Sequence, residues 1–286
     1  MNTATRPRYI LVTRKTRLEE LVERFNTWPQ AKFYLEHNGV DVKDYLDEHD
    51  TYRWQVATAE GILKQHGRLQ CLERRFLPHF HFNSDDTVVV IGQDGLVANS
   101  LKYLAGQSVI AINPDPARWD GKLLPFRISE LAEVLKACEA SALNDKRITL
   151  AEARTNDGQR LLAVNDLFIG PKTHTSARYK LHWHGQSEEQ SSSGIIVSTG
   201  FGSTGWFQSI LAGALGVMGQ DTHPLATGFD WGEDRLQFTV REPFPSRTTG
   251  IKLVFGDVTA NAPIALESLM PENGVVFFDG IESDYL

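Results

Sequence analysis

The turn Gly92–Gly95 (GQDG) has the residue types and the position of a phosphate-binding turn. It follows the apolar strand run 87–91 and precedes a run with helical spacing over 96–104. Glycines let a ligand approach the backbone, and the N–H groups at a helix N-terminus favour an anion. Asp94 adds a carboxylate, which makes sense there when a Mg²⁺ ion or a substrate hydroxyl is also bound. The turn therefore predicts phosphoryl transfer; the alternative is a glycine turn capped by an aspartate.

A second glycine cluster, Gly200–Gly205, matches the pattern G-x-G-x-x-G and follows a strand run at 194–199. In dinucleotide-binding dehydrogenases this pattern opens the domain, and an acidic residue follows about 20 positions later. Here the cluster lies late in the chain, and residues 220–224 read as a loop. A dehydrogenase is therefore one alternative. Ser203 and Thr204 are candidates to hydrogen-bond a ligand.

Asn165 and Asp166 are polar residues that interrupt the apolar stretch 161–170. Burying them without partners would cost roughly 1–3 kcal/mol each. They therefore need either an internal partner or a ligand, and a carboxamide beside a carboxylate suits an adenine edge and a ribose diol. A bulge or turn between two strands is the alternative.

The loop 113–121 (NPDPARWDG) follows a strand run at 108–113. Open parallel sheets bind their ligands at the carboxyl ends of the strands. Arg118 and Lys122 are therefore candidates to contact phosphates in this loop. The alternative is a rigid proline-rich loop without a ligand.

The elements around these motifs change in character along the chain. In the first half, strand runs alternate with helical runs, which is the pattern of an α/β domain with a parallel sheet; the strand runs are 9–13, 69–73, 87–91 and 108–113, and the helical runs are 17–26, 30–67, 96–104 and 130–141. The second half is rich in strand runs with hairpin-like spacing, at 147–154, 159–164, 178–183, 194–199, 235–240 and 250–255. The sequence therefore predicts an α/β half followed by a β-rich half.

The composition narrows the class of protein. A chain of 286 residues with a net charge of −7 has no basic stripe for a nucleic acid. The cysteines, Cys71 and Cys138, fit no metal spacing and are expected to be reduced packing residues of a cytosolic protein. No apolar run approaches the length of a membrane-spanning helix, and the first residues lack the core of a signal peptide.

Taken in order, the motifs resemble those of the NAD kinase family. The family's GGDG turn is similar to Gly92–Gly95, its Asn-Glu pair to Asn165-Asp166, its TxTGSTAY stretch to Thr199–Trp206, and its Asp-Gly near the C-terminus to Asp279-Gly280. Three segments resemble the mitochondrial-type branch: 113–116 (NPDP), 164–170 (VNDLFIG) and 240–243 (VREP). The resemblance extends over about residues 85–281.

The resemblance implies a Rossmann-like α/β domain over 1–128, joined by a C-terminal return over about 262–286, and a β-rich, β-sandwich-like domain over 129–261. It implies transfer of a phosphoryl group from ATP, with Mg²⁺, to the 2′-hydroxyl of the adenosine ribose of NAD. A cytoplasmic homodimer or larger homo-oligomer is expected, with NAD and ATP as ligands and no nucleic-acid or membrane partner.

The resemblance also assigns residue roles. Asp94 is the base or the metal-organising carboxylate, Asn165 faces the adenine, and Asp166 faces the ribose hydroxyls. The other substrate-binding residues expected are Gly92, Gln93, Gly95, Asn113, Thr199, Gly202, Ser203, Thr204 and Trp206.

The chain departs from the family at several of these positions. Gln93 replaces the second glycine of the turn, so its side chain either crowds the phosphates or binds them through its amide. Asp166 is one methylene shorter than the family's glutamate, and Gly205-Trp206 replaces Ala-Tyr. These changes leave two alternatives open: a kinase of the same fold that acts on another hydroxyl, such as a sugar or nucleoside, and a catalytically silent NAD-binding sensor.

Overall fold

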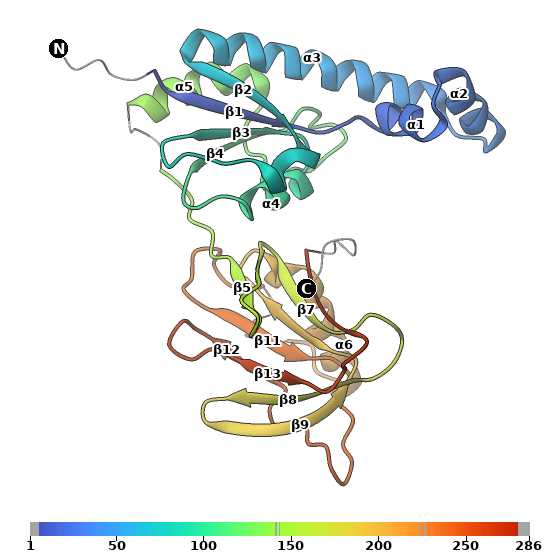
Figure 1. The fold of residues 1–286 in the computed structure, drawn as a ribbon, viewed down its shortest axis with the longest axis vertical. Helices are drawn as coiled ribbons and strands as arrows, with labels where there is room; N and C mark the ends of the chain where they lie inside the picture. The colour runs from blue at the N-terminus through green and yellow to red at the C-terminus, as the bar shows by residue number, and fades with distance from the viewer. Residues whose placement is uncertain (1–5, 141, 143, 223, 226, 280–286) are drawn as a thin grey trace. The chain divides into compact units, whose positions relative to one another are not determined.

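The computed structural model describes residues 6–279 apart from 141, 143, 223 and 226. The chain forms two compact units, Met1–Asn144 and Asp145–Leu286. Figure 1 shows that the first unit is a sheet covered by helices and that the second unit consists mainly of strands. None of the helices in the described part of the chain is long and apolar enough to span a bilayer.

The first unit is built on a four-stranded parallel sheet in the order β2-β1-β3-β4. Strands β1 and β3 are continuous apolar runs because both of their faces are buried. The helices α3 and α5 lie along one face of the sheet and α4 lies against the other (Figure 1). In chain order the elements are β1 (Arg8–Thr13), α1 (Arg17–Phe25), α2 (Trp28–His37), α3 (Val42–His66), β2 (Arg68–Glu73), η1 (Arg74–His79), β3 (Thr87–Ile91), α4 (Asp94–Leu101), β4 (Ser108–Ile112), η2 (Ile128–Glu130) and α5 (Leu131–Glu139).

The strand order reverses between β1 and β3. The chain leaves β1 toward β2 on one side, whereas it leaves β3 through α4 toward β4 on the other side. The two strands are in register with Val12 beside Val90, so their carboxyl ends are neighbours. Open α/β sheets bind ligands at such a topological switch point. Arg14 directly follows β1, and the turn Gly92–Gly95 directly follows β3, so both lie at this switch point.

The second unit contains two antiparallel sheets and a hairpin. The larger sheet has the order β12-β11-β10-β7-β14, the smaller has the order β13-β8-β9, and β5 pairs with β6. In chain order the elements are β5 (Ala151–Arg154), β6 (Arg160–Ala163), β7 (Asp166–Pro171), β8 (Ala177–Trp183), β9 (Gln186–Ser192), β10 (Ile195–Ser198), η3 (Gly202–Thr204), α6 (Trp206–Met218), β11 (Leu236–Val240), β12 (Phe255–Val258), β13 (Ala265–Ser268) and β14 (Gly274–Phe278).

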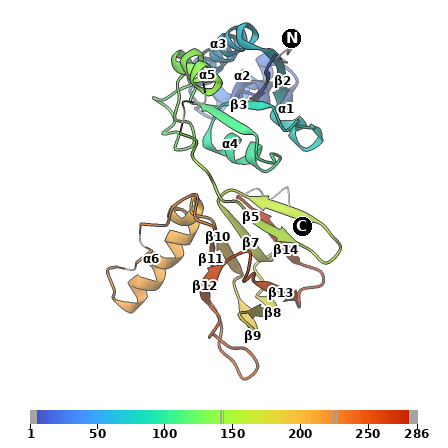
Figure 2. The same ribbon diagram turned by 90° about the vertical axis from the view of Figure 1, so that its left-hand side faces the viewer.

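The two sheets of the second unit share one apolar core. Tyr179 and Leu181 of β8 pack in the same cluster as Ile195 and Val197 of β10 and Phe238 of β11. Alternate residues of each strand therefore point inward, as in a sandwich of two sheets. Figure 2 shows α6 beside the larger sheet. The expected β-rich, sandwich-like architecture is confirmed, as is the parallel α/β architecture of the first unit.

Several strands of the second unit differ from the sequence-based prediction, which gave no strand at β9, β13 or β14. β9 has the sequence QSEEQSS, which carries no apolar alternation, and its pairing with β8 rather than its own residues makes it a strand. The strand expected at 250–255 instead begins at Phe255. The backbone before it is held by Glu188, whose carboxylate accepts hydrogen bonds from the N–H groups of Lys252 and Leu253.

The boundary between the units also differs from the expected one after residue 128. The helix α5 belongs to the first unit because Leu131 and Leu135 pack in the same core as α3. In the described residues, the segment expected to return to the first domain stays in the second unit. β13 pairs with β8 there, and β14 pairs with β7. The tail 280–286 lies outside the described residues.

Candidate functional site

The turn Gly92–Gly95 connects β3 to α4. Gln93 precedes the helix in an extended conformation, and its side chain makes no capping hydrogen bond. Gly92 is buried, and a Cβ atom there would lie 2.7 Å from the Cδ2 atom of Leu96. Gly95 is exposed, and a Cβ atom there would meet nothing within 4 Å. A Cβ atom at 92 would therefore displace the Leu96 side chain, whereas one at 95 would displace nothing, and a small residue there leaves room for a ligand to reach the backbone.

Asp94 is the first residue of α4 and fixes the loop that follows β4. Its carboxylate accepts hydrogen bonds from the backbone N–H groups of Leu123 at 2.7 Å and Lys122 at 3.2 Å. Asn113 is buried and braces the same loop, since its amide nitrogen donates to the carbonyl of Trp119 at 2.9 Å. The phosphate-binding turn and the proline-rich loop expected from the sequence therefore lie together, and Asn113 serves the loop itself.

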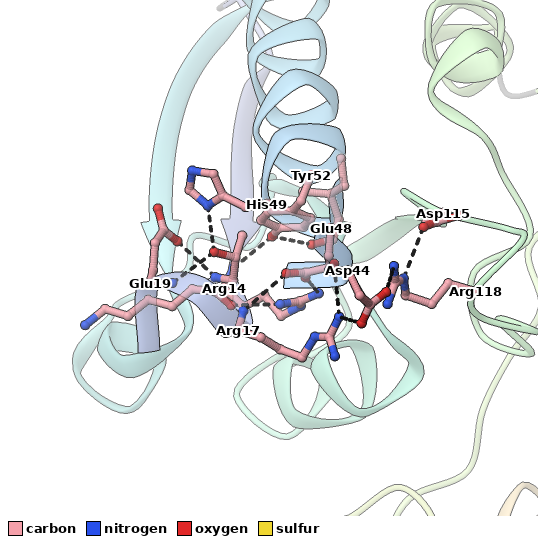
Figure 3. Close-up of polar contacts among 12 residues, drawn as sticks. Arg14, Arg17, Glu19, Asp44, Glu48, His49, Tyr52, Asp115 and Arg118 are labelled. Atoms are coloured by element: carbon pink, nitrogen blue, oxygen red, sulfur yellow. Dashed lines mark hydrogen bonds and ion pairs between the residues drawn. The ribbon is translucent and has the colours of Figure 1, made fainter. Parts of the chain in front are cut away.

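A cluster of ion pairs lies near the carboxyl end of β1 (Figure 3). Arg14 pairs with Glu48 at 2.7 Å, and both side chains are largely buried. Arg118 and Arg17 bind Asp44 at 2.6 and 2.7 Å. Hydrogen bonds from Arg118 and then Arg17 lower the pKa of Asp44 to about 2. Each of these three arginines has a carboxylate partner, so Arg118, a phosphate ligand expected from the sequence, is engaged within the protein.

Tyr52 joins the two strand ends at the switch point. Its hydroxyl donates a hydrogen bond to the carbonyl of Ile91 at 2.9 Å and accepts one from the N–H of Arg14 at 2.9 Å (Figure 3). Burial raises the pKa of Tyr52 to about 12, so the phenol stays protonated near neutral pH. The Gly92 turn therefore begins from a fixed strand end.

The second unit has a cavity of about 660 Å³ with an aromatic wall. The ring of Phe168 stacks on that of Trp206, with centroids 5.7 Å apart and planes at 16°, and on that of Phe277, at 6.1 Å and 19°. Gly170 and Gly194 make room for this arrangement, because a Cβ atom at either position would lie 2.5 Å from the ring of Phe168. The three nearly parallel rings all line the cavity, and aromatic side chains of this kind can stack on a planar heteroaromatic group.

Basic side chains border the same cavity. The guanidinium carbon of Arg241 lies 5.1 Å from the ring centroid of Trp206 and 5.9 Å from that of Phe168. Lys172 and His174 also line the cavity. Guanidinium and ammonium groups are the usual protein partners of phosphates. The cavity therefore combines a stacking surface with groups that bind anions.

Asp166 lines this cavity and is only 7% exposed. Burial raises its pKa to about 7, with a second contribution from the charge of Asp279. Asp279 lies beside it and is held differently: its carboxylate accepts hydrogen bonds from Asn165 N–H at 2.6 Å, Val164 N–H at 3.1 Å and Asp166 N–H at 3.4 Å. The Asn165-Asp166 pair and Asp279, which are more than a hundred residues apart in sequence, thus form one polar group. Gly280 lies outside the described residues.

Thr199 and Gly202, expected to contact the dinucleotide, hold the chain beside Asn165. The buried hydroxyl of Thr199 donates to the carbonyl of Val164 at 2.5 Å and accepts the N–H of Gly202 at 3.1 Å. A Cβ atom at Gly202 would lie 2.0 Å from the carbonyl oxygen of Asn165. The Asn165 side chain is partly exposed and makes no hydrogen bond to a described residue, so its amide is available to a ligand.

Ser203 is also internal. Its hydroxyl is buried, donates to the carbonyl of Gly200 at 2.6 Å and accepts the N–H of Phe229 at 3.0 Å. Thr204 is exposed and does not line the cavity. Of the residues expected from Thr199 to Trp206, Trp206 is the one that lines the cavity.

Metal-binding side chains are sparse. In the described part of the chain, no three His, Cys, Asp or Glu side chains are grouped so that they could hold a metal ion. Asp94 is the carboxylate at the turn Gly92–Gly95, and each of its oxygens accepts one backbone N–H and retains a further lone pair. Mg²⁺ is often held by one or two carboxylates together with water and substrate phosphates. The donor set therefore fits a cation that a nucleotide brings and does not form a separate metal site.

Comparison with known proteins finds similarity in fold but none in sequence to a family model or a curated protein. Neither a protein-family model nor a curated protein matches the chain. An NAD kinase from Archaeoglobus fulgidus, solved in complex with ATP, is 16% identical with a TM-score of 0.54, over 98% of this chain and 86% of that chain. Yeast NADH kinase, solved with NADH, is 14% identical with a TM-score of 0.52, over 97% of this chain and 76% of that chain.

This chain has an NAD kinase-like fold. The likeness spans both units, from the parallel sheet to the antiparallel sheets. It is shared by an archaeal and a yeast structure at similar scores, so it does not assign the mitochondrial-type branch that the sequence resembles.

Sequence reasoning missed most of the cavity of this NAD kinase-like fold. Phe168 and Phe277 lie in apolar strand runs, where nothing in the sequence tells a core ring from a cavity wall. The glycines that clear space for Phe168 were a usable signal, because Gly170 and Gly194 interrupt strand runs beside it. Arg241 was noticed only as part of a family-like segment, and its neighbours in the cavity come from other strands.

Proposed function

We propose that this chain is a phosphotransferase that moves a phosphoryl group from ATP to the 2′-hydroxyl of the adenosine ribose of NAD. The observation that carries the proposal is the cavity of the second unit. It places a flat aromatic wall, a border of cations and a buried carboxylate together. Those groups match the base, the phosphates and the ribose diol of a dinucleotide. The NAD kinase-like fold supports the same assignment.

In the proposed complex the cavity binds the acceptor. Trp206 and Phe168 stack on a base, Arg241 binds a phosphate, and Asp166 accepts a hydrogen bond from the ribose diol. Asn165 offers its side-chain amide to the adenine edge. Thr199, Gly202 and Ser203 act indirectly, because they fix the backbone that carries Asn165 and Trp206.

The turn Gly92–Gly95 is proposed to bind the phosphates of the donor. The exposed Gly95 admits them to the N–H groups at the start of α4, and the exposed side chain of Lys122 lies in the loop that Asp94 fixes. Asp94 would hold Mg²⁺, which when bound neutralises and orients the phosphates. Phosphoryl transfer depends mainly on positioning and charge stabilisation, so these few groups are sufficient.

A catalytically silent NAD-binding protein is the second candidate. It is favoured by Gln93, whose longer side chain stands in the turn where the family has glycine and is not used to cap α4. A silent protein would keep the cavity of the second unit and bind NAD without turnover.

The test is an assay of the purified protein with Mg-ATP and NAD, in which an NADP-specific dehydrogenase detects the NADP formed. The wild type is expected to form NADP, and Asp94→Asn to lose at least 10²-fold in rate, as is typical for loss of a charged catalytic group. Asp120→Asn is the matched control, because Asp120 is an exposed carboxylate of the same loop. NAD binding by calorimetry without any NADP would support the silent protein, and consumption of ATP with another hydroxyl compound would redirect the acceptor.

A further inference from the structure

The cavity of the second unit has an acidic end. Asp166 begins β7 and Asp279 directly follows β14, and the two strands pair with Leu167 beside Phe278. The N–H of Asp279 donates to the carbonyl of Asp166 at 3.1 Å, so the two residues lie opposite each other on neighbouring strands. Both residues line the cavity. Two carboxylates therefore share one end of it.

The two carboxylates differ in what surrounds them. Three successive backbone N–H groups, from Val164 to Asp166, donate to the carboxylate of Asp279 and stabilise its negative charge. No described residue donates a hydrogen bond to the carboxylate of Asp166, although this residue is only 7% exposed. Buried acceptors normally have a donor. Asp166 therefore has lone pairs that a ligand in the cavity can use.

Two basic side chains of the cavity lie at its other end. Lys172 directly follows β7, six positions after Asp166, which is about 20 Å along an extended strand. Its N–H donates to the carbonyl of Asn273, which precedes β14, whereas Asp279 follows β14. His174 comes two positions later in the loop after β7. The pair of strands β7 and β14 therefore separates the acids from these bases.

Arg241 belongs to the basic end as well. Its N–H donates to the carbonyl of Gly194 at 2.8 Å. Gly194 precedes β10, whose other end places Ser198 beside Asp166, about 13 Å further along the strand. The guanidinium carbon of Arg241 lies 5.9 Å from the ring centroid of Phe168. Burial and then the charge of Asp279 raise the pKa of Asp166 to about 7, and no described cation contributes.

A ligand of this cavity must match two ends of different charge. A pyrophosphate suits the basic end, because guanidinium and ammonium groups bind phosphate oxygens. A ribose diol suits the acidic end, because its hydroxyls donate to carboxylates. A phosphate at the acidic end would place like charges together in a buried site, which is strongly unfavourable. Acidic residues select the unphosphorylated ribose in other dinucleotide sites for the same reason.

We propose that Asp166 and Asp279 make the cavity specific for a dinucleotide whose adenosine ribose carries no phosphate, so that it binds NAD and rejects NADP; this inference rests on the proposed function. The two acids face the ribose hydroxyls, and Lys172 and Arg241 bind the pyrophosphate. The product of the proposed transfer is then repelled by the acids, and it competes weakly with the next molecule of NAD.

The experiment measures the dissociation constants of NAD and NADP for the full chain by calorimetry at pH 8, above the pKa of Asp166. The wild type should bind NAD about 10²-fold or more tightly than NADP. Asp166→Asn keeps an acceptor oxygen but removes the charge, so it should reduce this ratio by about tenfold or more, mainly through tighter binding of NADP. Asp234→Asn is the matched control, because Asp234 is an exposed carboxylate of the same unit that does not line the cavity. Its ratio should match that of the wild type.

Variants at each end of the cavity should behave differently. Arg241→Gln should weaken the binding of NAD and NADP by similar factors, about tenfold or more, because both ligands carry the same pyrophosphate. Its ratio should stay within about threefold of the wild type. Asp279→Asn should reduce the ratio, as Asp166→Asn does. If Asp279→Asn does not fold, as judged by circular dichroism, the comparison of Asp166→Asn with Asp234→Asn decides the question.

The outcomes separate this inference from the proposed function. A wild type that binds NAD and NADP equally, or an Asp166→Asn variant with an unchanged ratio, would overturn the inference, while NADP formation from Mg-ATP and NAD would still support the phosphotransferase. Selective binding of NAD without any NADP formation would support the inference and contradict the phosphotransferase. A wild type that binds neither ligand and forms no NADP would overturn both.

Discussion

Arg14, Arg17 and Arg118 in the first unit are each held by a carboxylate, whereas Asp166 in the second unit lines an open cavity with no cation bonded to it among the described residues. The first cluster is closed, since its charges are matched by its own side chains. The cavity is open, since it brings together aromatic rings, basic side chains and a buried acid, and the carboxylate of Asp166 bonds to no cation among the described residues. A closed cluster maintains the fold, and an open one is available to a ligand.

The paired charges of the first unit and the buried carboxylate of the second unit have opposite effects on stability. Matched charges at the end of β1 hold α3 to the sheet, so removing one partner leaves the other uncompensated. The buried carboxylate of Asp166 costs stability in its charged form, and proteins retain such groups where function needs them. The predictions below test this contrast, from the largest expected effect to the smallest.

Removing the charge of Glu48 should have the largest effect. In Glu48→Gln, the largely buried guanidinium of Arg14 loses its counter-charge, and the free energy of unfolding should fall by roughly 3–5 kcal/mol. Urea denaturation measures it. Asp44→Asn is the control on the exposed side of the cluster and should cost about 1 kcal/mol or less. Equal costs for the two variants would show that the cluster is not organised around a buried pair.

Removing the charge of Asp166 should raise the free energy of unfolding, whereas removing the charge of Glu48 lowers it. The folded pKa of Asp166, about 7, exceeds the ordinary value of 3.8, so the contribution of this group to stability is greatest below about pH 4 and is lost as the pH rises toward 7. Asp166→Asn cannot ionise and should be more stable than the wild type by roughly 4 kcal/mol at pH 8, about three pKa units at 1.36 kcal/mol each. At pH 4 the two should be nearly equal. A stability difference between variant and wild type that does not change with pH would contradict the burial of a titrating carboxylate.

The two glycines of the turn Gly92–Gly95 should behave differently when each is replaced by alanine. Gly92→Ala forces Leu96 to move and should cost roughly 1–3 kcal/mol. Gly95→Ala has free space and should leave the free energy of unfolding within about 0.5 kcal/mol of the wild type while lowering the rate of NADP formation. Thermal unfolding and the NADP assay of the same preparations measure both effects. Unchanged turnover in Gly95→Ala would remove this position from the site.

The smallest effect is expected at Arg118. Its contacts with Asp44 and Asp115 are partly exposed, so Arg118→Ala should change stability by less than about 1 kcal/mol. Because Arg118 is already paired, the KM for ATP should stay within about threefold of the wild type. A large rise in that KM would mean that Arg118 leaves Asp44 to bind phosphate, as the sequence first indicated.

The sequence predicted the parts that are encoded locally. Strand runs that alternate with helical runs indicated the parallel sheet, and strand runs with hairpin-like spacing indicated the β-rich half, because both patterns lie along the local sequence. The sequence did not predict the strand β9, because its pairing with β8 and not its own residues makes it a strand. The sequence did not predict the cavity, because Phe168 and Arg241 come together only when strands that are distant in sequence pair. The carboxylates of Asp166 and Asp279 were both noticed, but their adjacency depends on the pairing of β7 with β14.

The most direct test of the proposal that the cavity binds the dinucleotide is a calorimetric titration of NAD into the wild type, Trp206→Ala and Trp54→Ala. Trp206 lines the cavity and is 39% exposed, whereas Trp54 is 62% exposed on α3 and serves as the control. Stacking of a base on an aromatic side chain is worth roughly 1–3 kcal/mol, so Trp206→Ala should weaken the affinity about tenfold or more while Trp54→Ala matches the wild type. NAD that binds Trp206→Ala as tightly as the wild type, or that does not bind the wild type, would contradict the assignment of the cavity as the dinucleotide site.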